Sequence, residues 1–267
     1  MTAHFGRSHL AQLLEEEEDP LVTGAASGIG AAVTDLLLAK GLRVVGADIT
    51  PHEALGENHL PVSVDLSTER GAEDFVNAAA ERFQGIDALV NCVGVQLNRE
   101  DGFETIDDDD WARSYEINFA TAMRCIRAVL PEMKRRGGGA IVSISSLAAS
   151  EPQPPNIDYA AFKAALTTAS KALSREVALS GIRVNTVSPG PVDTPQFRRW
   201  FEGSHPGTPA DLDERMRRYA VDERGLPFGR LGTAREVAAV IAFLLGDDAS
   251  NVTGADIRVD GGASRGL

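Results

Sequence analysis

Cysteine is scarce in this sequence, with only Cys92 and Cys125 among 267 residues. So few cysteines cannot build the disulfide framework that stabilises many secreted proteins, and their scarcity fits a reducing compartment. Both cysteines lie in apolar stretches, which favours packing in a core over chemical reactivity.

Long hydrophobic runs are also lacking. No segment approaches the ~18 consecutive apolar residues of a membrane-spanning helix. Residues 1–20 contain no apolar run of signal-peptide type and end instead in acidic residues 15–19. We therefore expect a cytoplasmic protein.

Positive charge is in deficit, because 26 Lys and Arg face 39 Asp and Glu, a net charge of -13. Such a surface repels nucleic acid and anionic membranes at long range, so we expect neither as a main partner. Small molecules and other proteins remain as partners.

The residues that bind metals are not grouped. The five histidines are scattered without metal-ligand spacing, and the acidic run 107–110 lacks the spacing of a calcium loop. That run precedes Trp111 at an expected helix start, where negative charge is favourable. We expect no metal site.

Short apolar runs alternate with longer segments of helical periodicity along the chain. This rhythm predicts an α/β fold, a doubly wound, Rossmann-like parallel sheet of about seven strands with helices on both faces. The expected strands are 21–23, 43–47, 61–64, 88–91, 140–145, 183–188 and 256–259. The expected helices are 30–39, 72–83, 111–133, 159–180 and 234–245.

No linker or repeat divides the chain, so we expect a single catalytic domain over 20–267. An acidic N-terminal tail, 1–19, mobile or helical, precedes it. The segment 194–230 breaks the regular pattern and is rich in arginine, with Trp200, Phe201 and Tyr219. A long irregular insertion is often a functional lid; a solvated surface loop with some helix is the alternative.

A glycine-rich turn, Thr23-Gly24-Ala25-Ala26-Ser27-Gly28-Ile29-Gly30, follows the first expected strand and opens the first helix. Glycines allow a sharp turn and a close approach of the backbone to a pyrophosphate, and the helix N-terminus offers free N–H donors. The spacing differs from the general G-x-G-x-x-G dinucleotide fingerprint. The turn therefore indicates a phosphate-bearing cofactor without proving one.

Asp48 lies 18 residues after Gly30 at the end of the second expected strand. An acidic group there binds the adenosine ribose hydroxyls and repels a 2′-phosphate. Its neighbours Ser27, Ile49 and Thr50 supply no cation, so we expect NAD (NAD+/NADH) in preference to NADP. Alternatively, Asp48 is only a turn residue at the end of a strand.

From about Leu21 to Gly262 the chain resembles the short-chain dehydrogenase/reductase family. The glycine turn matches the family's Thr-Gly-x-x-x-Gly-x-Gly motif, and Asn91-Cys92-Val93-Gly94 is similar to its Asn-Asn-Ala-Gly segment. The resemblance implies a catalytic tetrad of Asn118, Ser146, Tyr159 and Lys163. It implies cofactor contacts by Gly24, Ser27, Gly28, Ile29, Gly30, Asp48, Asp65, Leu66, Asn91, Gly94, Tyr159, Lys163, Pro189, Gly190, Val192 and Thr194.

The tetrad has the residue types that proton transfer requires. Tyr159 and Lys163 are four residues apart on one helix face, and a nearby ammonium favours the phenolate form of a tyrosine. Ser146, expected at the end of the fifth strand, can hydrogen-bond the substrate oxygen. Asn118 resembles the residue that holds a water in a proton relay to the lysine.

The chain departs from the family at the first strand, where Glu18, Asp19 and Pro20 replace an apolar run. Proline lacks the N–H of the strand ladder, and a buried aspartate needs a partner. We expect a short first strand.

These features predict an NAD(P)-dependent enzyme that transfers hydride between nicotinamide and a secondary alcohol or ketone. The alternative is an inactive NAD-binding regulatory or scaffold protein of the same fold. An epimerase or dehydratase of related architecture is disfavoured, because the chain is short and has no added substrate domain. The resemblance also implies a homo-oligomer, a tetramer or dimer, which pairs through 111–133, 159–180 and the C-terminal strand.

Overall fold

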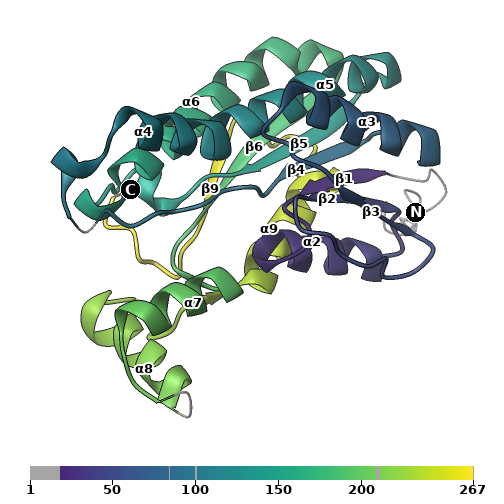
Figure 1. Cartoon of the computed structure of the whole chain (residues 1–267). Coiled ribbons are helices and arrows are strands. Elements are labelled where there is room, and N and C mark those ends of the chain that lie inside the picture. Colours follow the sequence, from purple (N-terminus) through teal and green to yellow (C-terminus); the bar gives the residue numbers. More distant parts are fainter. Residues whose placement is uncertain (1–18, 84, 100, 209–210, 267) are drawn as a thin grey trace, which may run out of the picture.

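The computed structural model describes residues 19–83, 85–99, 101–208 and 211–266. Its centre is a parallel sheet of seven strands in the order β3-β2-β1-β4-β5-β6-β9 (Figure 1). This confirms the predicted doubly wound sheet, because the order reverses between β1 and β4. The strands are β1 (Pro20–Thr23), β2 (Val44–Asp48), β3 (His59–Ser63), β4 (Ala88–Asn91), β5 (Gly139–Ile144), β6 (Ile182–Pro189) and β9 (Asp256–Val259).

Helices cover both faces of the sheet (Figure 1). On one face α3 (Glu69–Phe83), α5 (Thr121–Arg136) and α6 (Ile157–Val177) enclose a core that includes Phe75 and Met133. On the other face α2 (Gly28–Ala39) and α9 (Ala234–Leu245) enclose a second core around Val90 and Ile241. Strands buried on both sides explain the near-continuous apolar runs in the sequence.

The first strand begins at Pro20, one residue earlier than predicted, and Pro20 lies opposite Ala88. A proline is tolerated at the first position of a strand. Asp19 just before it is buried, at 1% exposure, and its carboxylate accepts hydrogen bonds of 2.7 and 2.8 Å from Arg43. Burial raises the pKa of Asp19 in spite of this cation. Arg43 is thus the partner that a buried aspartate requires.

The predicted helix 111–133 is divided by a π-helical turn, Glu116–Ala120, between α4 (Asp108–Tyr115) and α5. Asp107 begins α4 by accepting a hydrogen bond from the Asp110 amide, as its acidic run predicts. In the described part of the chain, short 3-10 helices lie at Phe103–Thr105, Leu147–Ala149, Pro154–Asn156, Ala178–Ser180 and Asp247–Ala249.

The 194–230 segment folds into α7 (Pro195–Ser204), α8 (Leu212–Arg218) and a second π-helical turn, Tyr219–Glu223. These helices extend away from the sheet (Figure 1) and have a small core of their own, with Phe201 at its centre. Two short strands that the sequence did not predict, β7 (Val192–Asp193) and β8 (Gly232–Thr233), pair at the base of the segment.

No helix in the described part of the chain has the length and apolarity needed to cross a membrane. The prediction of an acidic tail over 1–19 lies outside the described residues, apart from Asp19.

Candidate active site

A cleft of about 830 Å³ opens at the carboxyl edge of the sheet, where open α/β sheets bind ligands. It brings together the glycine turn, three members of the predicted tetrad and the segment after β6. The predicted residues that line it are Gly24, Ser27, Gly28, Ile29, Gly30, Gly94, Ser146, Tyr159, Lys163, Pro189, Gly190, Val192 and Thr194. Asp48, Asp65, Leu66, Asn91 and Asn118 do not line it.

The glycine turn has the geometry that close phosphate binding requires. Gly24 and Gly28 have φ angles of 68° and 59°, in the left-handed region that favours glycine. A Cβ on Gly30 would stand 2.1 Å from the carbonyl oxygen of Gly24, so only glycine fits there. Ser27 precedes α2 in extended conformation without a side-chain cap, which leaves the first-turn N–H groups for an anion. These features fit a dinucleotide pyrophosphate.

Asp48 supports this turn directly. One of its carboxylate oxygens accepts a hydrogen bond from the Ala26 amide at 3.1 Å, and the other accepts one from the Thr50 amide at 2.8 Å. Asp48 therefore stabilises the turn through both of its carboxylate oxygens. Each carboxylate oxygen still has acceptor capacity for a ribose hydroxyl.

The other three predicted cofactor residues outside the cleft differ in environment. Asp65 is exposed and accepts a 2.9 Å hydrogen bond from the Ser67 amide, and hydrogen bonds from Ser67 lower its pKa. Leu66 is buried. Asn91 ends β4 and donates a 3.1 Å hydrogen bond to Ser143, while its buried Oδ1 has no partner among the described residues.

Tyr159 and Ser146 lie beside one another in the cleft. Tyr159 is in the first turn of α6 and is half-buried. Burial raises its pKa, and the nearby Ser146 hydroxyl lowers it by a smaller amount. Ser146 lies two residues beyond the end of β5 rather than at its end, where its Oγ accepts a 3.1 Å hydrogen bond from the Ala148 amide. It begins a 3-10 turn that fixes the hydroxyl.

Lys163 follows one helical turn after Tyr159 and is 1% exposed. Its ammonium lies 5.6 Å from the centre of the Tyr159 ring and donates a 2.7 Å hydrogen bond to the Ile144 carbonyl oxygen. Burial lowers the pKa of this lysine to about 8. A lysine with such a pKa exchanges protons near neutral pH.

Asn118 approaches this group from the far side of the loop that follows β4. It lies in the first π-helical turn, is buried, and exchanges two hydrogen bonds of 2.9 and 3.0 Å with the backbone of Val95. Gly94 separates Asn118 from Lys163, because a Cβ on Gly94 would lie 3.3 Å from Asn118 Oδ1 and 2.9 Å from Lys163 Nζ. The π turn is of a kind frequent at functional sites.

Part of the cleft wall comes from the 194–230 segment. The sequence pointed to this segment but did not identify the individual residues that line the cleft. The lining residues from this segment include Trp200, His205, Tyr219, Glu223 and Arg224. His205 stacks on Phe201 with ring centres 4.4 Å apart, and its Nε2 lies 3.3 Å from a carboxylate oxygen of Glu223. The broken periodicity of 194–230, its arginines and its aromatic residues were the signals in the sequence.

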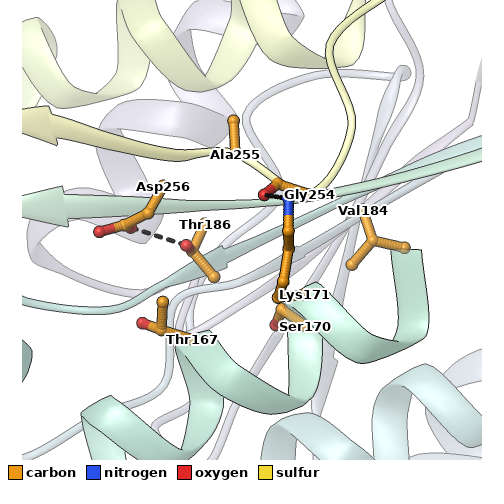
Figure 2. Close-up of a pocket in the computed structure, with 8 residues that line it drawn as sticks. All are labelled: Thr167, Ser170, Lys171, Val184, Thr186, Gly254, Ala255 and Asp256. Atoms are coloured by element: carbon orange, nitrogen blue, oxygen red, sulfur yellow. Dashed lines mark hydrogen bonds between the residues drawn. The ribbon is translucent and has the colours of Figure 1, made fainter. Parts of the chain in front are cut away.

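A second, smaller cavity of about 110 Å³ lies between α6 and the strands β6 and β9 (Figure 2). Lys171 donates a 2.7 Å hydrogen bond to the Gly254 carbonyl oxygen, and Thr186 donates one of 2.6 Å to Asp256. These bonds join the C-terminal strand to its neighbours. None of the predicted site residues lines this cavity.

The cleft therefore offers two chemical environments. At one end lie free backbone donors and small residues, which suit phosphate. At the other lie a phenol, a hydroxyl and an ammonium, which suit the binding and protonation of an oxygen atom. Within the described residues, no group of three or more His, Cys, Asp or Glu is placed to hold a metal ion.

Comparisons with known proteins agree with this geometry. A family model described as enoyl-(acyl carrier protein) reductase matches residues 24–264. A 3-oxoacyl-acyl-carrier-protein reductase from Salmonella typhimurium is 33% identical, covering 91% of this chain and 95% of the relative. Cis-4-hydroxycyclohexanecarboxylate dehydrogenase from Sinomonas cyclohexanicum is 36% identical, covering 92% and 96%.

Two solved structures are similar throughout. The ligand-free aldohexose dehydrogenase of Thermoplasma acidophilum has a TM-score of 0.86 at 26% identity, covering 94% of this chain and 95% of that one. The 3-ketoacyl-(acyl-carrier-protein) reductase of Brucella melitensis, complexed with NADH, has a TM-score of 0.80 at 27% identity, covering 92% and 98%.

Proposed function

This chain belongs to the short-chain dehydrogenase/reductase family, and on that premise we propose that it transfers hydride between a nicotinamide cofactor and a secondary alcohol or ketone. One observation carries the proposal: Ser146, Tyr159 and Lys163 meet in the same cleft as the glycine turn. A dinucleotide that extends from that turn would bring its nicotinamide ring to the tyrosine.

Ser146 and Tyr159 act on the substrate oxygen. The serine hydroxyl donates a hydrogen bond that holds the oxygen, and the phenol gives it a proton in reduction or removes one in oxidation. When bound, the nicotinamide supplies or accepts the hydride. The Lys163 ammonium stabilises the phenolate, and its burial strengthens this interaction because solvent screens a buried charge less than an exposed one.

Asn118 completes the group by holding the loop that lies against Lys163. Its side-chain amide accepts a hydrogen bond from the Val95 amide and donates one to the Val95 carbonyl oxygen, so that Gly94 stays close to the ammonium. A water held near this loop would return protons to Lys163. An inactive scaffold protein would not require this set of proton-transfer groups, so their presence favours an enzyme.

The cofactor is held by residues along the carboxyl edge of the sheet. Gly28, Ile29 and Gly30 would hold the pyrophosphate, and the segment 189–194 would hold the nicotinamide. Asp48 would bind the adenosine ribose, while Asp65 and Leu66 would contact the adenine. The charge of Asp48 favours NAD over NADP, and a related structure was solved with NADH.

The substrate carries a secondary hydroxyl or keto group and occupies the space between Tyr159 and the insertion. The named relatives are a 3-oxoacyl-acyl-carrier-protein reductase, a cis-4-hydroxycyclohexanecarboxylate dehydrogenase and an aldohexose dehydrogenase, so their names agree on the reaction class and differ in the substrate. We propose that 194–230 is a lid over this space. We propose also that the protein works as a homo-oligomer.

The test is a panel of secondary alcohols offered with NAD+, with reduced cofactor followed by absorbance. Tyr159→Phe keeps the ring but lacks the transferable proton, so turnover should fall at least a hundredfold while NADH binding persists. Tyr115→Phe is the matched control, because Tyr115 is 40% exposed on α4 and does not line the cleft. If Tyr159→Phe retains a tenth of wild-type turnover, the proposed role of Tyr159 is wrong.

A further inference from the structure

We propose that Arg99 is a positioning residue of the active site, which fixes the loop after β4 against the first turn of α6 and so sets the position of Tyr159. The inference rests on the proposed function, because it concerns the placement of the proposed proton-transfer group.

Arg99 joins three parts of the chain. Its guanidinium donates hydrogen bonds of 2.9 and 3.3 Å to Asp158, the residue before Tyr159, and one of 2.8 Å to Asp110 in the first turn of α4. Its backbone amide donates a 2.7 Å hydrogen bond to the Pro155 carbonyl oxygen, just before α6. A planar guanidinium can serve two carboxylates at once, which a lysine cannot do with the same geometry.

Asp158 depends on this arginine. Its carboxylate is 1% exposed, and its Oδ1 is buried with no hydrogen-bond partner among the described residues. A buried carboxylate is tolerated only when a cation or donors compensate its charge. Asp158 therefore holds the first turn of α6 to Arg99, and a shift of either residue moves the backbone on which Tyr159 stands.

The same loop has a second anchor four residues earlier, where Val95 is bonded to Asn118. Between the two anchors Gln96 and Asn98 line the cleft. The loop is thus fixed at one end to the proposed proton relay and at the other end to the helix of Tyr159. Arg99 itself does not line the cleft, so its action passes through these neighbours.

The chain offers a matched control at the opposite edge of the sheet. Arg43 likewise binds a buried aspartate with two hydrogen bonds, of 2.7 and 2.8 Å to Asp19, and neither residue lines the cleft. Loss of Arg43 and loss of Arg99 each leave a buried carboxylate without its arginine. Only the loss of Arg99 should disturb Tyr159.

The experiment compares Arg99→Met with Arg43→Met in the full chain, at a temperature at which circular dichroism shows both to be folded. We expect Arg99→Met to lower kcat at least tenfold, with KM and Kd for NADH within twofold of wild type. Arg43→Met should keep kcat within twofold. If the fold loss of kcat in Arg99→Met is less than five times the fold loss in Arg43→Met, the inference is overturned.

Two further variants cover the remaining outcomes. If Arg99→Met does not fold, Arg99→Lys is measured in its place. Its single ammonium cannot bind both carboxylates as the guanidinium does. At least a threefold loss of kcat then supports the inference, and a smaller loss overturns it. Tyr159→Phe, measured in parallel, separates the two proposals. An active Tyr159→Phe removes the proposed function, whereas an inactive Tyr159→Phe with a normal Arg99→Met removes only this inference.

Discussion

The ammonium of Lys163 donates a 2.7 Å hydrogen bond to the carbonyl oxygen of Ile144, the last residue of β5. This bond fixes the α6 lysine to the end of a central strand, in an interior where it is 1% exposed. The fold thus carries a buried ammonium close to Tyr159, and such a group costs stability when it is charged.

We predict that this cost depends on pH. Burial lowers the pKa of Lys163 to about 8 in the folded protein, below its ordinary value of 10.5. The unfolded chain therefore binds the proton more tightly, so the penalty is complete below pH 8 and disappears as the pH rises toward 10.5. Between pH 7 and pH 10 the free energy of unfolding of wild type should gain about 2 to 3 kcal/mol relative to Lys163→Met.

Urea unfolding followed by circular dichroism at both pH values measures this difference. Lys163→Met is the reference because it lacks the titrating ammonium, so titrating groups that do not interact with Lys163 cancel. A difference between the two proteins that does not change with pH would show that Lys163 is not buried as an ammonium.

The close approach at Gly94 gives a second prediction. A Cβ there would lie 2.9 Å from Lys163 Nζ, so Gly94→Ala must displace the ammonium or the loop. Overpacking of this kind costs about 1 to 3 kcal/mol, and we expect kcat to fall at least tenfold. Gly246→Ala is the control, because its Cβ meets only ordinary contacts of 3.7 Å at the end of α9. Steady-state kinetics of both variants check the expectation, and equal kcat values would contradict it.

The parallel sheet was predictable because its signal is local. Strands buried on both faces appear as short apolar runs, and all seven expected runs correspond to strands of the sheet. The two-residue strands β7 and β8 are too short to leave such a pattern. Likewise, the periodicity of 111–133 did not reveal the π-helical turn, because a single turn of five residues is too short to establish a period of its own.

At the site, the residues that could not be predicted from the sequence are those whose role depends on contacts with residues far away in the chain. The residues of the motifs were identified because their types and spacing are distinctive, and most of them line the cleft. Arg99 was not, because its partners are 11 and 59 residues away and arginine is common on protein surfaces. The same holds for Arg43, which compensates Asp19 across 24 residues.

A third prediction concerns the proposed lid, 194–230. This segment has its own small core around Phe201 and extends from the sheet on the β7 and β8 pair, an arrangement that permits movement as a unit. Hydrogen exchange should show slower exchange in α7 and α8 when NAD+ and substrate are bound. Equal, strong protection with and without ligands would identify a fixed structural element instead.

A fourth prediction is that the protein forms a homo-oligomer. In the single chain β9 is at the edge of the sheet, and α6 presents small residues outward, with Ala172 exposed. Small side chains allow two helices to approach closely. Light scattering at micromolar concentration should give two or four times the chain mass of 28.4 kDa. A monomer mass would reject the expectation.

The last prediction is that NAD(H) is preferred over NADP(H), with Asp48 as the main cause. Its carboxylate ends β2 beside the glycine turn, where a 2′-phosphate would meet a like charge. Two unit charges about 4 Å apart at an effective dielectric of about 20 interact by roughly 4 kcal/mol, before screening by solvent. Even half of this energy gives more than a tenfold preference.

Because Asp48 also accepts hydrogen bonds from the Ala26 and Thr50 amides, its removal alters the turn as well as the charge. Asp48→Asn is therefore the first comparison, since an amide oxygen keeps one acceptor without the charge. This variant should raise the catalytic efficiency with NADPH relative to that with NADH. Asp48→Ala with Ile49→Arg adds a cation at a position that is 72% exposed, and should raise that ratio further. If wild type uses both cofactors equally well, or if neither variant changes the ratio, the discrimination arises elsewhere in the cleft and Asp48 serves only the turn.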